Sequence, residues 1–278
     1  MGSGLIIAGQ RVQTPGLDVT NWLDLPVLRL RHLEDFVRRR AREWVRVIVL
    51  HTTKGLPARL GDEPQRILPG LGPSLGAGER CARYWSRDGR QAGAHLVVDQ
   101  DGQVFQTADL LTEATYHCPG WNQPGIGVEI YQGAGGELYE GQLDATVRLC
   151  DAITRQEARD DEGREICIQR VIPHQYTGPI PRFVNHAADD VVGVIGHRDA
   201  SNRRGPGDPG SAVMYRLGAA GYEPVNFGLG EDRELWRRRQ REHGIGPGDG
   251  IPGPKTRAAL KAKGFPHGLW VPRPGDDA

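Results

Sequence analysis

Three polar residues follow apolar segments of the sequence, where a binding site can form at the rim of a sheet. His51 comes directly after the almost uninterrupted apolar run 45–50, and His197 follows the run 191–195 and a glycine. Ten residues separate His197 from Asp208, which follows it in the sequence. Two imidazoles and a carboxylate are typical of catalytic zinc, because three protein ligands leave the fourth position for water. The spacing alone is equally compatible with hydrogen-bonded structural histidines at strand ends.

The segments that must position these residues are strands and helices in alternation. The runs 45–50, 125–131 and 191–195 predict buried strands. Residues 94–99 and 103–107 predict two further strands, joined through a tight Asp-Gly turn. Strands mixed with helices, and including a hairpin, indicate an α/β fold with a mixed central sheet flanked by helices.

Two helices are predicted within this domain. Residues 140–158 carry an apolar stripe that includes Leu143 and Cys150. The dipeptide Asp208-Pro209 has the form of an N-cap and first-turn proline, which predicts a helix through Leu217. The expected organisation is an N-terminal extension over 1–44, a domain over 45–222, and a linker with a small helical tail over 223–278.

Five blocks of sequence, in order over much of this domain, resemble the type-2 N-acetylmuramoyl-L-alanine amidases, which are related to the peptidoglycan-recognition proteins. No single block is specific, but their order and number are. The blocks are Val-Ile-Val-Leu-His51-Thr-Thr, Gly93-Ala-His-Leu-Val-Val-Asp-Gln-Asp-Gly-Gln-Val, Tyr116-His117, Asn122-x-x-Gly-Ile-Gly-Val-Glu129, and Gly196-His197-Arg-Asp199 followed by Asp208-Pro-Gly.

The resemblance implies that His51, His197 and Asp208 bind Zn²⁺ and that Glu129 is the catalytic acid and base. It also implies that His117 lines the cleft and that Asn122 is a polar residue ahead of the Glu129 strand. The activity implied is hydrolysis of the amide between N-acetylmuramic acid and L-alanine, with peptidoglycan or a muropeptide as substrate.

Several neighbouring residues receive separate interpretations. The family often has an oxyanion-stabilising lysine at the position of Pro206, and we expect Arg204, or Arg203, to substitute for it. Gly125 stands where the family usually has serine. Trp121, next to a glycine in a loop, is a candidate for stacking on sugar. His95, in an alternating strand, is expected to have a structural hydrogen-bonding role.

The composition limits the classes of partner. Lysine plus arginine equal aspartate plus glutamate at 35 each, so we expect no nucleic-acid partner. No apolar run reaches the roughly 20 residues that span a membrane, and we expect no membrane insertion. Without an export signal, synthesis in the cytoplasm is expected, with a monomeric protein. The four cysteines form no C-x-x-C pair and are expected to be reduced.

The tail contains Asp249-Gly-Ile-Pro-Gly-Pro-Lys-Thr256, which resembles a shortened peptidoglycan-binding domain. This favours a phage- or prophage-type lysin, which acts on the wall after release, over a cytosolic muropeptide-recycling amidase. A recognition protein that binds without cutting is the alternative from another class, but such binders typically lack a metal ligand. An iron oxygenase is disfavoured, because His197-x-Asp199 follows His51 in the wrong order.

Overall fold

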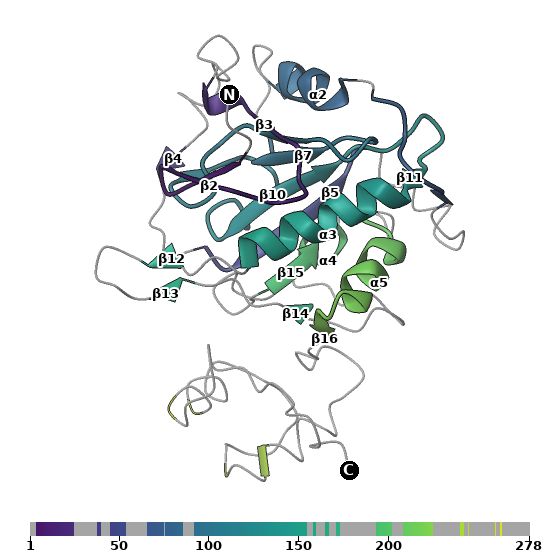
Figure 1. The fold of residues 1–278 in the computed structure, drawn as a ribbon. Helices are drawn as coiled ribbons and strands as arrows, with labels where there is room; N and C mark the ends of the chain where they lie inside the picture. The colour runs from purple at the N-terminus through teal and green to yellow at the C-terminus, as the bar shows by residue number, and fades with distance from the viewer. Residues whose placement is uncertain are drawn as a thin grey trace.

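The structure is a computed structural model of the 278-residue chain. It describes residues 4–24, 38–39, 45–53, 66–74, 76–85, 92–154, 158–159, 165–166, 171–172, 193–201 and 208–224, together with 240–241, 244, 259 and 262. Figure 1 shows how these segments are arranged. Most of the tail, for which a small helical unit and wall binding are expected, lies outside the described residues. Arg204 lies outside them as well.

A six-stranded mixed sheet forms the centre of the fold, in the order β15-β5-β10-β7-β8-β3. All neighbours are parallel except β7 and β8, which form the antiparallel hairpin expected around the Asp-Gly turn. The mixed central sheet predicted from the sequence is confirmed. Its strands are β15 (Gly193–Gly196), β5 (Val47–Thr52), β10 (Gly125–Ile130), β7 (Leu96–Val98), β8 (Val104–Gln106) and β3 (Val19–Asn21).

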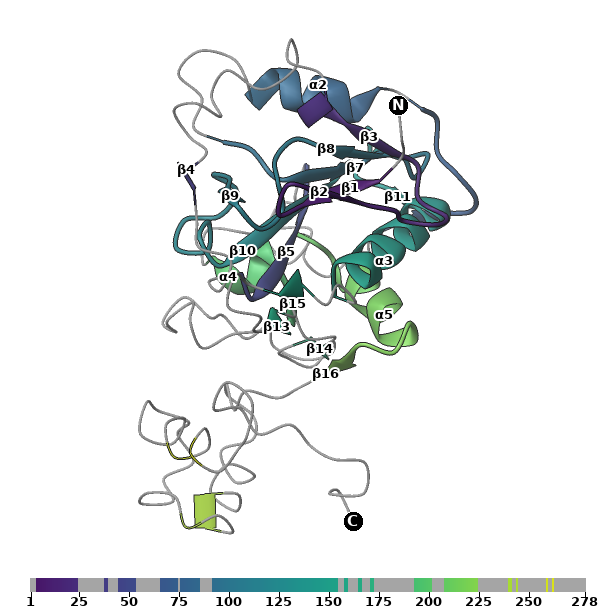
Figure 2. The same cartoon turned by 60° about the vertical axis from the view of Figure 1, so that its left-hand side comes forward.

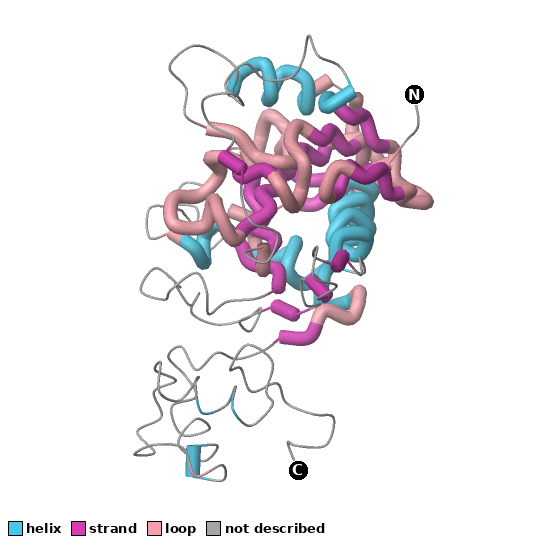
Figure 3. The backbone as a smooth tube through the Cα atoms, turned by 90° about the vertical axis from the view of Figure 1, so that its left-hand side faces the viewer, coloured by secondary structure: helices cyan, strands magenta, loops and turns pink. Residues whose placement is uncertain are grey.

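Helices cover both faces of this sheet. α3 (Glu140–Thr154) and α5 (Ser211–Ala219) pack on one face, and α2 (Ala77–Trp85) lies on the other (Figure 2). Figure 3 shows the strands, in magenta, between α2 at the top and the helices lower in the view. The fold is therefore a layered α/β arrangement with its central sheet buried.

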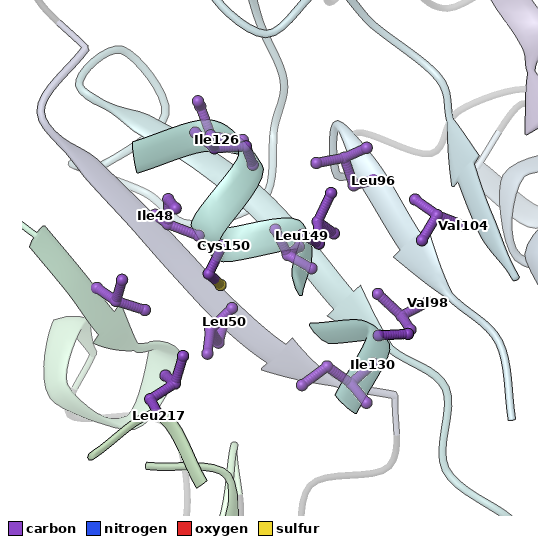
Figure 4. Packing of buried hydrophobic residues seen from close by; sticks show 14 of the residues in the cluster. Ile48, Leu50, Leu96, Val98, Val104, Ile126, Ile130, Leu149, Cys150 and Leu217 are labelled. Atoms are coloured by element: carbon purple, nitrogen blue, oxygen red, sulfur yellow. The ribbon is translucent and has the colours of Figure 1, made fainter. Parts of the chain in front are cut away.

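The alternation of side chains along β5 assigns each residue to a face. Ile48 and Leu50 belong to the core under α3, where Figure 4 shows them beside Leu149 and Cys150. Because successive strand residues point to opposite faces, Val49 and then His51 occupy the face that α3 does not cover. The apolar run positions its terminal histidine outside the main core.

Shorter elements complete the described chain. They are β1 (Leu5–Ile7), β2 (Gln10–Val12), the 3-10 helix η1 (Trp22–Asp24), β4 (Arg38–Arg39), β6 (Ile67–Leu68), β9 (Glu113–Ala114), β11 (Leu138–Tyr139), β12 (Ala158–Arg159), β13 (Glu165–Ile166), β14 (Val171–Ile172), α4 (His197–Ala200) and β16 (Glu223–Pro224). The helix expected to run to Ala158 ends at Thr154, and Ala158 begins β12.

The segment expected as an extension over 1–44 contributes to the same sheet. β3 pairs with β8 as the edge strand. The Gln106 side chain accepts from the Ile6 backbone N–H at 2.7 Å and donates to the Ile6 carbonyl at 2.7 Å, as a neighbouring strand would. Asp109 accepts from the N–H groups of Ala8 and Gly9 at 3.0 and 2.6 Å. The boundary expected at residue 45 therefore separates segments that share one sheet.

Candidate metal centre and cleft

His51 and His197 meet because their strands are parallel neighbours. In the β15–β5 register Gly196 is opposite Leu50, so the next residues, His197 and His51, emerge side by side. Their Nδ1 atoms lie 2.8 Å apart, and each residue is 3% exposed. Parallel pairing thus brings together two imidazoles separated by more than half of the chain.

Asp208 completes the cluster from the loop that precedes α5. Its Oδ2 lies 3.2 Å from His197 Nδ1, and its Oδ1 accepts the Thr52 backbone N–H at 2.9 Å. The residue is 1% exposed. The expectation that it caps a helix is wrong, because α5 begins at Ser211 and its N-cap is Gly210. The carboxylate is turned toward the histidines instead.

The short helix α4 holds Asp208 in place. The Asp199 carboxylate accepts the Gly196 N–H at 2.7 Å, which fixes the turn after β15. The Arg198 N–H donates to the Asp208 carbonyl at 2.7 Å and ties the loop to that turn. Burial lowers the pKa of the Arg198 guanidinium, while the charges of Asp199 and Asp208 oppose this shift. The Arg198 guanidinium is buried, with its Nε 3.7 Å from Asp199 Oδ1.

These three side chains fit a metal ion. One donor atom from each of His51, His197 and Asp208 lies within 4.8 Å of the others, and among the described residues they are the one group of this kind. Two imidazole nitrogens facing each other at 2.8 Å cannot both carry a proton. A bound cation would accept lone pairs from both rings and from the carboxylate. Two nitrogens and one oxygen are a ligand set that zinc accepts.

Glu129 stands beside the cluster on the neighbouring strand. In the parallel β10–β5 register Glu129 is directly opposite His51, so both side chains project from the same face. The residue is half-buried, whereas the rest of β10 is buried. Glu129 also lines an open cleft of about 640 Å³ together with all three residues of the cluster. A carboxylate in this position can exchange protons with a molecule in the cleft.

The opposite wall of the cleft comes from α2 and was not predicted. Arg80, Cys81, Arg83 and Tyr84 line the cleft from this helix. Burial, and secondarily the charges of Glu129 and Asp99, raises the pKa of the Cys81 thiol, so it remains protonated. The sequence signal for this helix was an apolar pair four residues apart, Cys81 and Trp85, with Arg83 between them.

The three residues expected to bind substrate differ in position. His117 is half-buried and lines the cleft, where its Nδ1 lies 3.1 Å from His51 Nε2. Asn122 does not line the cleft, and its Oδ1 accepts the Cys118 N–H at 2.7 Å, which closes the loop. Trp121 is 3% exposed and also does not line the cleft. Trp121 is therefore buried by packing and presents no exposed face to a sugar.

His95 has the structural role expected of it. It is fully buried, its Nε2 contacts the Glu113 carbonyl at 2.8 Å, and its Nδ1 accepts the Gly127 N–H at 3.0 Å. The Thr115 hydroxyl lies 2.9 Å from the same Nδ1. Both ring nitrogens thus link the residue ahead of β7 to Glu113 in β9 and to Gly127 in β10.

Gly125 and Gly127 make room for His117 on the sheet. A Cβ on Gly127 would lie 2.5 Å from His117 Cγ, and one on Gly125 would lie 2.6 Å from the Trp121 carbonyl oxygen and 3.0 Å from His117 Cε1. All three distances are shorter than van der Waals contact. The glycine at position 125 is thus explained by the close approach of the loop that carries Trp121.

Cys81, Cys118 and Cys150 form no disulfide bond. Cys150 lies in the core, as the stripe on α3 predicted, and burial raises its pKa.

Among the described residues, no helix combines the length and the apolar character needed to cross a bilayer.

Residues 40–211, more than half of the chain, match the sequence pattern of the family described as N-acetylmuramoyl-L-alanine amidase. Among solved structures, Drosophila Peptidoglycan Recognition Protein (PGRP)-SA is similar at 13% identity and a TM-score of 0.41, over 78% of this chain and 99% of that chain. The endolysin N-acetylmuramoyl-L-alanine amidase LysCS from Clostridium intestinale is similar at 13% identity and a TM-score of 0.31, over 62% and 95%. An endolysin from a Thermus scotoductus bacteriophage is similar at 18% identity and a TM-score of 0.30, over 56% and 86%. The chain has no match among curated protein sequences.

Proposed function

Since the chain belongs to the N-acetylmuramoyl-L-alanine amidase family, we propose that it cleaves peptidoglycan at the muramoyl–alanine amide with a zinc ion held by His51, His197 and Asp208. The observation that carries this proposal is the convergence of three buried donor atoms at the end of a cleft. A complete ligand set, with Glu129 beside it, favours cleavage over binding without catalysis.

Different residues of the chain have different proposed roles in amide hydrolysis. A zinc ion bound there would act as a Lewis acid on the scissile carbonyl and make a water nucleophilic near neutral pH. Glu129 accepts the proton of the attacking water and passes it to the departing alanine nitrogen. The cleft holds the glycan and stem peptide, with α2 as one wall. Arg204 is retained as the proposed oxyanion-stabilising residue, in place of the usual lysine.

Zinc dependence is tested by removing and restoring the metal. We expect one zinc per chain by elemental analysis of the purified protein, because the cluster offers three protein ligands. Treatment with a chelator should abolish release of peptide from purified cell walls, measured by mass spectrometry, and added Zn²⁺ should restore it. A mock-treated sample passed through the same desalting steps is the control. Full peptide release by metal-free protein would contradict the proposed mechanism.

We also propose that this enzyme is a phage- or prophage-type lysin, monomeric and made in the cytoplasm, which reaches the wall after release. The tail supports this role, because residues 249–256 resemble a wall-binding motif. A recycling enzyme acting on soluble muropeptides would gain nothing from such a segment.

Deletion of residues 229–278 separates wall binding from catalysis. We expect the truncated chain to sediment less with insoluble walls, since it lacks the proposed binding segment. Its cleavage of a small soluble muropeptide should stay near that of the full chain, because the cluster and cleft lie ahead of residue 229. Equal loss of binding and cleavage would instead assign the tail to the catalytic fold.

A further inference from the structure

The two ring nitrogens of His51 face different partners. Nδ1 lies 2.8 Å from His197 Nδ1, within the proposed metal cluster. Nε2 lies 3.1 Å from His117 Nδ1, on the side away from His197. The His51 and His117 rings meet edge to face, with centroids 5.2 Å apart and an interplanar angle of 89°. This geometry aims an N–H in the plane of one ring at its neighbour.

When one ring nitrogen of a neutral histidine binds a metal, the ring proton must be on the other nitrogen. A neutral imidazole carries a single ring proton, so Nδ1 can offer its lone pair to a cation only when the proton is on Nε2. That N–H then needs an acceptor, because a buried donor without a hydrogen-bond partner destabilises the fold. His51 is 3% exposed, and His117 Nδ1 is an acceptor within reach.

We propose that His117 is a positioning residue for the metal centre, whose Nδ1 accepts the proton of His51 Nε2. The hydrogen bond selects the tautomer in which His51 Nδ1 binds the metal and fixes the orientation of the ring. The inference rests on the proposed zinc site. It replaces the substrate-binding role expected for His117 with one that acts through His51.

The surrounding fold is shaped to hold His117 in this position. The ring lies against Gly127, where a Cβ would come within 2.5 Å of its Cγ and 2.8 Å of its Cβ. The His117 backbone N–H donates to the Thr115 carbonyl at 3.1 Å. The hydrogen bond from Cys118 to Asn122 then closes the loop that follows. Asn122 thus stabilises the segment that carries His117.

His95 shows that not every buried histidine here serves the cluster. Its ring lies 5.9 Å from that of His117, but its nitrogens contact Glu113, Thr115 and Gly127. His117 is the histidine whose Nδ1 faces His51 Nε2.

Zinc affinity of His117 variants tests the proposal. His117→Leu removes the acceptor at similar volume, whereas His117→Asn keeps an acceptor oxygen near the position of Nδ1. We expect the Leu variant to bind zinc about 10–100-fold more weakly in competition with a chromophoric chelator, the usual effect of losing a partner of a metal-bound histidine. The Asn variant should lie closer to the wild type. KM for a soluble muropeptide at saturating zinc should change little in either.

Gly127→Ala provides an independent variant, because its methyl group would displace the His117 ring without altering the ring's chemistry. It should weaken zinc binding as His117→Leu does. Cys81→Ser, on α2 across the cleft, is the control and should bind zinc like the wild type. Thermal unfolding of each metal-free variant confirms that the comparison is made on folded protein.

Two outcomes would overturn the proposal while leaving zinc binding intact. One is equal zinc affinity in the wild type and His117→Leu, with a raised KM, which would restore a substrate-binding role. The other comes from long-range ¹⁵N–¹H NMR of the zinc-loaded wild type, which needs no variant to fold. We expect the His51 proton on Nε2, and a proton on Nδ1 would contradict the inference. A wild type that binds no zinc would instead refute the proposed metal site, and the positioning role with it.

Discussion

Glu129→Gln is expected to lower turnover by about 10²–10⁴-fold, which is the usual contribution of a positioned acid or base. Glutamine keeps the length and shape of the side chain but cannot take a proton from water. Because Glu129 lies opposite His51 on the next strand and is not one of the three clustered donors, the variant should keep its zinc. The measurements are kcat for a soluble muropeptide, bound zinc, and the midpoint of thermal unfolding.

Glu137→Gln is the matched control. Glu137 is also half-buried, but it packs against Gly133 and does not line the cleft. Its variant should keep normal kcat. If Glu129→Gln unfolds at a much lower temperature, or turns over at a near-normal rate, Glu129 is a structural carboxylate and the acid–base group must be another residue.

The strands that carry the site were predictable because one factor, burial on both faces of the sheet, dominates their sequences. β5 and β10 are buried on both faces, so they appear as nearly continuous apolar runs. Polar residues at or beyond the ends of such runs, Glu129 and His51 among them, then stand out. The side-by-side placement of His51 and His197 follows from parallel pairing, which no local pattern specifies.

The elements that were missed or misplaced are short or depend on distant contacts. β1 and β3 have three residues each, too few for a period, and the Gln106 side chain helps to place β1. α2 has nine residues and a short apolar stripe. The depth of Trp121 could not be predicted, because it depends on how its loop closes on β10.

The helix cap expected at Asp208 was wrong for a related reason. Aspartate before proline has the local form of a helix cap, and the sequence contains no sign that α5 starts at Ser211. The carboxylate's partners, Thr52 and His197, come from two strands that only the folded sheet brings together. The local pattern predicted a cap, whereas the family resemblance implied a metal ligand, which is the role that the tertiary position of the carboxylate supports.

A pair of substitutions at Asp208 separates a ligand from a structural acceptor. Asp208→Asn can still accept the Thr52 N–H through its amide oxygen, so the loop should stay attached to β5. The amide is neutral, however, and is a poor ligand for zinc. We expect this variant to fold normally, to lose its zinc, and to lose wall-lytic activity with it.

Asp208→Cys is expected to do the opposite. It removes the acceptor for the buried Thr52 N–H, at a cost of about 1–3 kcal/mol in the free energy of unfolding. It also supplies a thiolate, which zinc binds readily beside two histidines. Bound zinc, measured by elemental analysis, should therefore be higher in the Cys variant than in the Asn variant. The unfolding midpoint of the metal-free proteins should instead be higher in the Asn variant than in the Cys variant. If the Asn variant keeps both metal and activity, the carboxylate serves only to hold the loop, and the third ligand is another residue. The two roles can be separated because they predict different orders of stability and zinc content. If Asp208 were only a structural acceptor, the variant with the lower stability would also have the lower zinc content.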